Sequence, residues 1–133
     1  MDIEKKPVPS AKSTEFAVDT LLQACHSRAY NNGWWHNPQT GEFVQRPVPE
    51  LLCLIHSEIS EALEGFRKDL KDDHLPQFDM LTVELADAMI RIADMAKGYD
   101  LPLAAALNAK LEYNDRRADH KPENRAKEGG KKI

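Results

Sequence analysis

Apolar side chains recur every three or four residues in four stretches of the chain, which is the spacing of a helix with one buried face. The four stretches cover residues 13–30, 47–70, 78–97 and 100–117. Ser13 or Thr14 is expected to cap the first helix, and Asp100 to cap the fourth. Gly33 and Gly98 are expected to end the first and third helices.

Four helices, short connections and no long strand predict an all-α fold, a four-helix bundle, in a single domain. Aromatic and β-branched residues flank an Asn-Pro turn signal in residues 34–44, which predicts a long aromatic loop or a small hairpin between the first two helices. The expected organisation is a flexible arm (1–12), a helical domain (13–117) and a basic tail (118–133).

Carboxylates interrupt the apolar stripes of the second and third helices. In the second helix, Glu58 and Glu61 fall within a stripe that includes Leu51, Leu54, Ile55 and Ala62. In the third helix, Glu84 and Asp87 fall within a stripe flanked by Met80, Val83 and Ile90. Since buried carboxylates tend to become neutral unless a cation compensates them, the pattern favours a divalent metal site.

The proposed ligands are all oxygen atoms, from Glu58, Glu61, Glu84 and Asp87, and such a set favours Mg²⁺, or Mn²⁺ in its place. The alternative is that these acids lie in solvent or pair with Arg67, Arg91 and lysines. Glu64 lies off the Glu58–Glu61 line and would support the site or activate a water. Asp94 would bind a second ion or pair with Lys97.

A di-iron bundle is the competing class, but it requires Glu-x-x-His on two helices, and this sequence has none. The five histidines are scattered, which suits surface or packing roles. No glycine-rich phosphate loop and no pair of nucleophile and base is present. The sequence therefore gives no support to covalent catalysis.

Trp34 and Trp35 are adjacent, so at most one of them can face the core of an extended segment. In one interpretation, one ring covers the bundle while the other packs at an oligomer contact. In the other, one ring stacks on a flat ligand such as a nucleobase.

The composition limits the classes of partner and the cellular environment that the sequence fits. The formal charge of −4 and the lack of a basic, aromatic stripe argue against nucleic-acid binding. No apolar run approaches the ~20 residues of a membrane span, and the N-terminus lacks the apolar core of a signal peptide. Cys25 and Cys53 are expected to be buried free thiols in a reducing cytoplasm.

The acidic motifs, Glu58-Ile59-Ser60-Glu61 and Glu84-Leu85-Ala86-Asp87, resemble the paired signature of the MazG-like, all-α nucleoside triphosphate pyrophosphohydrolases. The run from Lys110 to Arg117 is similar to the lysine–asparagine–arginine motif of that family. The Asn-Gly-Trp-Trp segment also resembles an aromatic stretch of many members. One departure is Ser57, where many members have a further glutamate.

The resemblance implies Mg²⁺-dependent hydrolysis of a (deoxy)nucleoside triphosphate to the monophosphate and pyrophosphate, for nucleotide-pool sanitising or dNTP-pool adjustment. It implies that Glu58, Glu61, Glu84 and Asp87 hold the metal and that Glu64 assists catalysis. The substrate-binding residues would be Lys110, Tyr113, Asn114, Arg117, Asn32, Trp34 and Trp35. It also implies a homodimer or homotetramer.

Two alternative hypotheses place the chain in other functional classes. A non-catalytic helical nucleotide-sensing or oligomerisation module would bind nucleotide without releasing pyrophosphate, and Ser57 favours it. A helical adaptor without a pocket would place the four acids in solvent.

Overall fold

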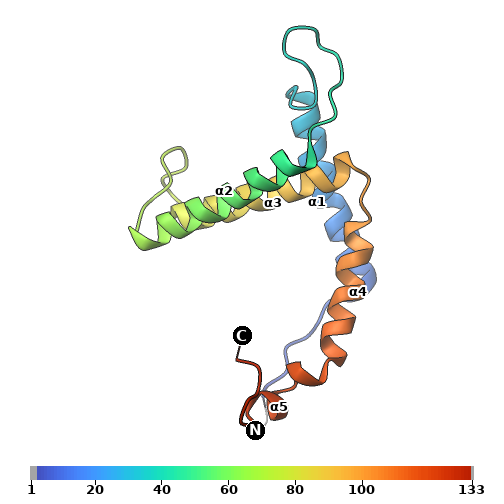
Figure 1. Cartoon of the computed structure of the whole chain (residues 1–133), viewed down its shortest axis with the longest axis vertical. Helices are drawn as coiled ribbons and strands as arrows, with labels where there is room; N and C mark the ends of the chain where they lie inside the picture. Colours follow the sequence, from blue (N-terminus) through green and yellow to red (C-terminus); the bar gives the residue numbers. More distant parts are fainter. Residues whose placement is uncertain (1–2, 133) are drawn as a thin grey trace. The chain divides into compact units, whose positions relative to one another are not determined.

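The computed structural model describes residues 3–132 and shows an all-helical chain (Figure 1). Four long helices are followed by a 3-10 turn and a short helix: α1 (Ala11–Asn31), α2 (Val48–Arg67), α3 (Met80–Gly98), α4 (Leu103–Arg116), η1 (Ala118–His120) and α5 (Pro122–Arg125). The described residues form no β-strand, which confirms the predicted all-α class.

Two predicted helix starts were wrong. Helix α1 begins at Ala11, ahead of Ser13, because the hydroxyl of Ser10 accepts the backbone N–H of Ser13 at 3.1 Å and so caps the helix. Helix α4 begins after Pro102, and Asp100 does not cap it. Instead Asp100 has a φ of 50°, in the left-handed region.

Other boundaries shift by a few residues. Helix α2 ends at Arg67 rather than about Leu70, and α3 begins at Met80 rather than about Phe78. Gly33 follows α1 with a φ of 86°, as predicted for the residue that ends this helix. The tail expected after Arg117 contains the two short helical segments η1 and α5.

The chain divides into two compact units, and the division falls within α1. One unit is Thr20–Leu101, which contains α2 and α3. The other combines the residues up to Asp19 with those from Pro102 onward, which include α4, η1 and α5.

In the unit Thr20–Leu101, α2 and α3 lie side by side and pack closely against each other (Figure 1). The face of α2 turned inward carries Leu51, Glu58, Ala62 and Gly65, all buried. A Cβ atom at Gly65 would lie 2.8 Å from the Cβ of Met80 on α3, so this glycine allows the two backbones to approach. Of the predicted stripe, Leu51, Glu58 and Ala62 are buried, Leu54 and Ile55 are partly exposed, and Glu61 is exposed.

The core of this unit is centred on Trp35, which is fully buried. Its indole N–H donates to Oδ1 of Asp94 at 2.9 Å. Its ring stacks on Phe43, with centroids 6.3 Å apart, and meets His26 and Tyr99 edge-on. Trp34, in contrast, is 65% exposed, so one of the two adjacent rings faces the core, as expected.

Residues 32–47 connect α1 to α2 through a tight turn. The side chain of Asn37 accepts the backbone N–H groups of Gln39 and Thr40, at 2.8 and 3.1 Å. A single antiparallel bridge joins His36 to Phe43, without extended strands. The turn brings Phe43 onto Trp35 and thereby closes one side of the core.

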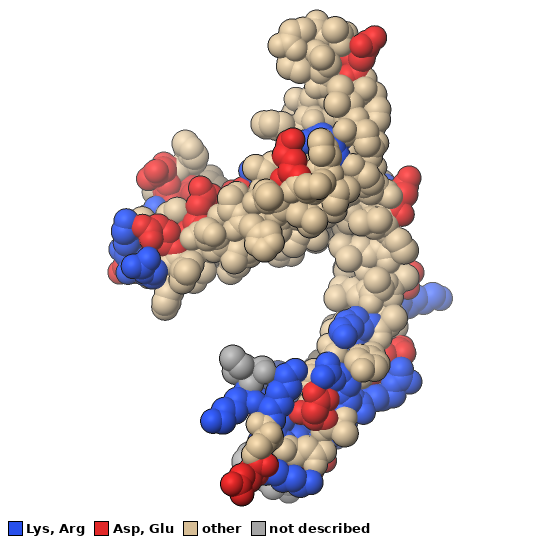
Figure 2. Space-filling model, in the orientation of Figure 1, with Lys and Arg blue, Asp and Glu red and all other residues tan. Residues whose placement is uncertain are grey.

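In the second unit, the side-chain amide of Asn108 on α4 donates to the carbonyl of Ala11 at 2.8 Å. The segment after α4 is held by Lys121, which donates to the carbonyl of Asp115 at 2.7 Å, and by Asn124, which donates to that of Ala118 at 2.7 Å. Lys and Arg side chains gather over this part of the chain in Figure 2.

Candidate metal centre and adjacent cavity

Three carboxylates converge between α2 and α3. Glu58 extends from the inward face of α2, and Glu84 and Asp87 lie one turn apart on α3. One oxygen of each carboxylate lies within 4.8 Å of the others, and Glu58 is 5% exposed. Because Glu84 and Asp87 are three residues apart, both lie on the face of α3 that is turned toward Glu58 on α2.

Arg91 pairs with this cluster: its Nε donates to Oε1 of Glu58. Burial raises the pKa of Glu58, but the hydrogen bonds with Arg91 and Glu84 outweigh burial, so this pKa lies below its ordinary value. The alternative interpretation, in which the acids pair with arginines instead of a metal, therefore holds for Glu58 and Arg91.

The pKa values of Glu84 and Asp87, unlike that of Glu58, are raised. Burial, the hydrogen bond with Glu58 and the charges of Glu61, Glu58 and Asp87 raise the pKa of Glu84 to about 7. Burial and the charge of Glu58 likewise raise the pKa of Asp87, although Arg91 opposes them. Arg91 thus acts on Glu58 and Asp87, and the surroundings of Glu84 oppose its charge.

The donor set fits a hard divalent cation. Carboxylate oxygens are the ligands that Mg²⁺ and Mn²⁺ prefer, and Mg²⁺ usually completes its shell with waters and substrate phosphates. A cation here would relieve the like-charge repulsion that raises the pKa of Glu84 and Asp87. The residues that would hold it are Glu58, Glu84 and Asp87.

The structure does not bring every predicted acid into this cluster. Glu61 is exposed and outside the convergent set, but its charge acts on Glu84. Glu64 pairs with Lys68 and Arg67 on its own helix, and its pKa is lowered chiefly by the hydrogen bond with Lys68.

Asp94 does not pair with Lys97, which was one of its two predicted roles. Its carboxylate is 6% exposed and interacts with Nδ1 of His26, at 2.8 Å, and with the indole N–H of Trp35. Lys97 pairs with Asp100 instead, at 4.0 Å. Asp94 is therefore committed to the aromatic core, where a metal ion would have to displace both partners.

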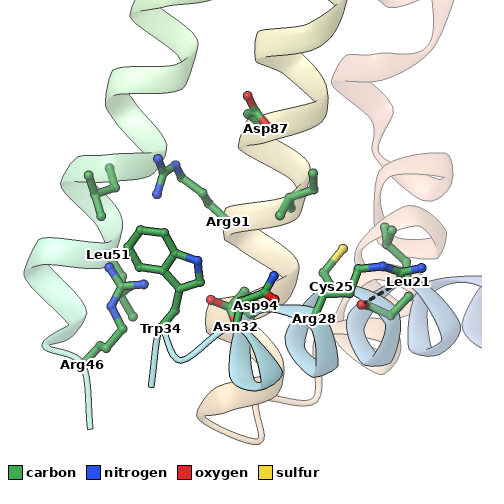
Figure 3. A pocket seen from close by; sticks show the side chains of 14 residues that line it. Leu21, Cys25, Arg28, Asn32, Trp34, Arg46, Leu51, Asp87, Arg91 and Asp94 are labelled. Carbon is green, nitrogen blue, oxygen red and sulfur yellow. Dashed lines mark hydrogen bonds between the residues drawn. The ribbon is translucent and has the colours of Figure 1, made fainter. Parts of the chain in front are cut away.

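A cavity of about 580 Å³ lies beside the acidic cluster, within the unit Thr20–Leu101 (Figure 3). That volume is within the range of about 300–1,000 Å³ usual for small-molecule sites. Its lining is mostly apolar, with a few polar groups, including Arg28, Asn32, Trp34, Arg46, Asp87 and Arg91. Asp87 belongs to both the cluster and the cavity, so the two form one continuous site.

The remaining predicted substrate residues lie in the other unit. Lys110 places its ammonium 4.7 Å from the ring centroid of Tyr113, and Arg117 lies 5.7 Å from the same ring while it forms an ion pair with Asp119. Oδ1 of Asn114 is buried without a hydrogen-bond partner in the described residues. These side chains thus form a local cluster around α4.

Sequence reasoning missed Arg28 and Arg46 of the cavity and the partners of Asp94, and it named Arg91 as a possible partner of the acids but not as part of a cavity. Arg91 follows Asp87 by four residues, so its position on the same face was open to prediction. Arg28 and Arg46 lie outside any acidic or basic motif, and no local pattern marks them. The two cysteines are free, but Cys53 is exposed rather than buried.

Comparisons with protein-family models, with curated proteins and with solved structures found no match. Among the described residues, no helix combines the length and the apolar character needed to cross a membrane.

Proposed function

We propose that this chain is a Mg²⁺-dependent pyrophosphohydrolase that converts a (deoxy)nucleoside triphosphate to the monophosphate and pyrophosphate. The observation that carries the proposal is the convergence of Glu58, Glu84 and Asp87 beside a cavity of suitable size for a nucleoside. The resemblance of the acidic motifs to the MazG-like, all-α family adds to it. Its role would be nucleotide-pool sanitising or dNTP-pool adjustment.

In this proposal Glu58, Glu84 and Asp87 hold the cation, and Glu61, at the exposed edge of the cluster, completes the ligand set or orients water. A bound divalent cation neutralises a polyphosphate and lowers the pKa of a water ligand. Glu64 is a weaker candidate, since Lys68 and Arg67 engage its carboxylate.

The base would lie in the cavity. Trp34 is exposed there and offers a flat face, and the amide of Asn32 offers both a donor and an acceptor. Trp35 would support the site from the core rather than touch substrate. The phosphate and sugar roles of Lys110, Tyr113, Asn114 and Arg117 rest on the family resemblance alone.

We further propose that the chain works as a homodimer or homotetramer whose four-helix bundle joins α2–α3 pairs from two copies. Apolar side chains between 41% and 68% exposed recur at helical spacing along both helices: Leu52, Ile59, Leu63, Phe66, Leu85, Met89 and Ile92. In Figure 2, much of the flank of this helix pair lacks charged side chains. Covering such stripes requires another apolar surface.

The test is pyrophosphate release from a panel of common and modified NTPs and dNTPs, with Mg²⁺ and with EDTA. The proposal predicts release that requires the metal and that is abolished by Glu61→Gln without loss of helicity. Saturable nucleotide binding without any release would instead favour the sensing module. Ser57 favours that alternative, since its hydroxyl bonds only to the carbonyl of Leu54 at 2.7 Å, where many family members have an acid.

A further inference from the structure

Three arginines line the cavity, and two of them are already engaged. Arg28 donates to the carbonyl of Ala24 in its own helix at 3.0 Å, and Arg91 donates to Glu58. Arg46 is engaged more weakly, by one hydrogen bond that its terminal nitrogen donates to Oε1 of Glu50. Its ion pair with Glu50 is long, at 3.4 Å, beyond the usual range of about 2.7–3.2 Å.

Arg46 nevertheless lines the cavity in a position to contact a ligand. Its side chain is only 15% exposed, and its backbone carbonyl accepts the hydroxyl of Tyr99. Its Cζ lies over the ring of Trp34, 6.0 Å from the centroid, at the outer limit of a cation–π contact. A largely buried guanidinium with unused donors next to an exposed aromatic ring is suited to hold a flat ligand.

The acidic cluster and Arg46 lie at different ends of the site. Asp87 and Asp94 both line the cavity, two helical turns apart on α3, which is roughly 10 Å at the rise of an α-helix. In Figure 3, Trp34 and Arg46 lie toward the Asp94 end, and Arg91 lies between them and Asp87. Phosphates held at the acidic cluster would therefore leave the base, rather than a phosphate, beside Arg46.

We propose that Arg46 selects nucleotides whose base is a 6-oxopurine, such as guanine or hypoxanthine; this inference rests on the proposed function. A guanidinium has only donors, arranged as a planar fork. The O6 and N7 atoms of a 6-oxopurine are two adjacent acceptors that match this fork. Adenine would place its amino donor against the same donors, and a pyrimidine offers a single carbonyl on that edge.

Asn32 does not change this selection. Its side-chain amide can rotate to present either its oxygen or its nitrogen, so it accommodates several bases. Arg46 cannot exchange donors for acceptors, and it is the residue that would discriminate. A lysine at this position would keep the charge but lose the fork.

The test measures binding of GMP, IMP and AMP in saturating Mg²⁺, by calorimetry, since the three share one phosphate, lack an anhydride bond to hydrolyse and differ in the base. Wild-type protein is expected to prefer GMP and IMP over AMP by about tenfold or more. Arg46→Gln and Arg46→Lys should both remove that preference while AMP affinity changes little. Arg67→Gln, on the exposed end of α2, is the matched control and should retain it.

Three results would overturn the assignment: equal binding of AMP and GMP by wild type, an equal loss for all three nucleotides in both Arg46 variants, or an equal loss of tripolyphosphate binding, which would assign Arg46 to phosphate. Circular dichroism melts of each variant exclude misfolding as the cause. Because monophosphate binding needs no turnover, a preference for 6-oxopurines without pyrophosphate release would refute the proposed reaction and keep the base selection. Absence of binding by all three, with pyrophosphate release intact, would refute the base selection and keep the proposed reaction.

Discussion

Glu84 is a residue whose surroundings oppose its charge. Burial and neighbouring carboxylates raise its pKa to about 7, whereas in an unfolded chain it would titrate near 4.5. Between these two pH values the folded state binds more protons than the unfolded state, so its stability falls as the pH rises. Glu58, with a lowered pKa, contributes in the opposite direction and only at acidic pH.

Without divalent cations, the free energy of unfolding should therefore fall between about pH 4.5 and pH 7, by on the order of 3 kcal/mol. Glu84→Gln should flatten that decrease, because glutamine does not titrate. Urea unfolding in EDTA at several pH values measures both proteins. Saturating Mg²⁺ should restore stability most at pH 7 and above, where the carboxylates are ionised. An identical pH profile in wild type and variant would refute this account of Glu84.

Asp94 is a buried acid whose partners, Trp35 and His26, belong to the aromatic core. Asp94→Asn keeps an oxygen acceptor but removes the negative charge of the carboxylate, whose Oδ1 meets both Trp35 and His26 and strengthens both contacts. A loss of about 1–3 kcal/mol in unfolding free energy is expected, measured by urea denaturation. Asp100→Asn, at a side chain that is 90% exposed, is the control and should change stability by less than about 0.5 kcal/mol. Equal effects would contradict the role given to Asp94.

Helical spacing predicted that Glu58, Glu84 and Asp87 share one interior, and the structure brings them together. It did not separate Glu61 from them. Three residues advance a helix by about 300°, so Glu61 lies about 60° from Glu58 and reaches the exposed edge of the stripe. The positions of Arg46 and Arg28 depend on how distant segments fold together, and such contacts leave no local pattern.

At the scale of elements, the long helices were predictable because their apolar periodicity is sustained over several turns. Their ends were less so, since Ser10 competes with Ser13 and Thr14 as a cap and Pro102 displaces the start of α4. At most one of the adjacent Trp34 and Trp35 side chains was predicted to face the core. Which ring enters the core depends on a tertiary contact, the hydrogen bond from Trp35 to Asp94.

One contact between elements decides whether Trp35 can enter the core. A Cβ at Gly98, near the end of α3, would lie closer than 3.0 Å to the buried indole, which has no free space to move into. Gly98→Ala should therefore lower stability by about 1–3 kcal/mol despite the better helix propensity of alanine. Thermal and urea unfolding measure this effect, with the exposed Thr82→Ala as control. A neutral or stabilising Gly98→Ala would show that the indole packs elsewhere.

At the scale of the whole molecule, the apolar stripes of α2 and α3 face away from their own pair and need a partner. An amphipathic pattern in the sequence predicts that one face of a helix is buried, but it does not identify the surface that buries that face. The sequence predicted a bundle of the chain's own four helices, whereas among the long helices of the described residues α2 and α3 are the pair that packs closely; the proposed assembly would complete a four-helix bundle with a second α2–α3 pair.

Leu63→Glu combined with Met89→Glu places charges on both stripes and should convert the proposed oligomer to monomers. Analytical ultracentrifugation at micromolar concentrations measures the mass. Ser60→Glu, exposed on α2 outside the stripe, should leave the oligomer intact. A monomeric wild-type protein, or an oligomer that survives the double substitution, would contradict the proposed assembly.

The most direct measurement is Mg²⁺-dependent pyrophosphate release by wild type, Asp87→Asn and Glu64→Gln under the same conditions. Asp87 is one of the convergent carboxylates, whereas Glu64 is engaged by Lys68 on the flank of α2. The account predicts that Asp87→Asn lowers turnover by at least about a hundredfold and that Glu64→Gln retains most of it. Full activity in Asp87→Asn, with the variant folded, would contradict the central claim that this cluster is the catalytic metal centre.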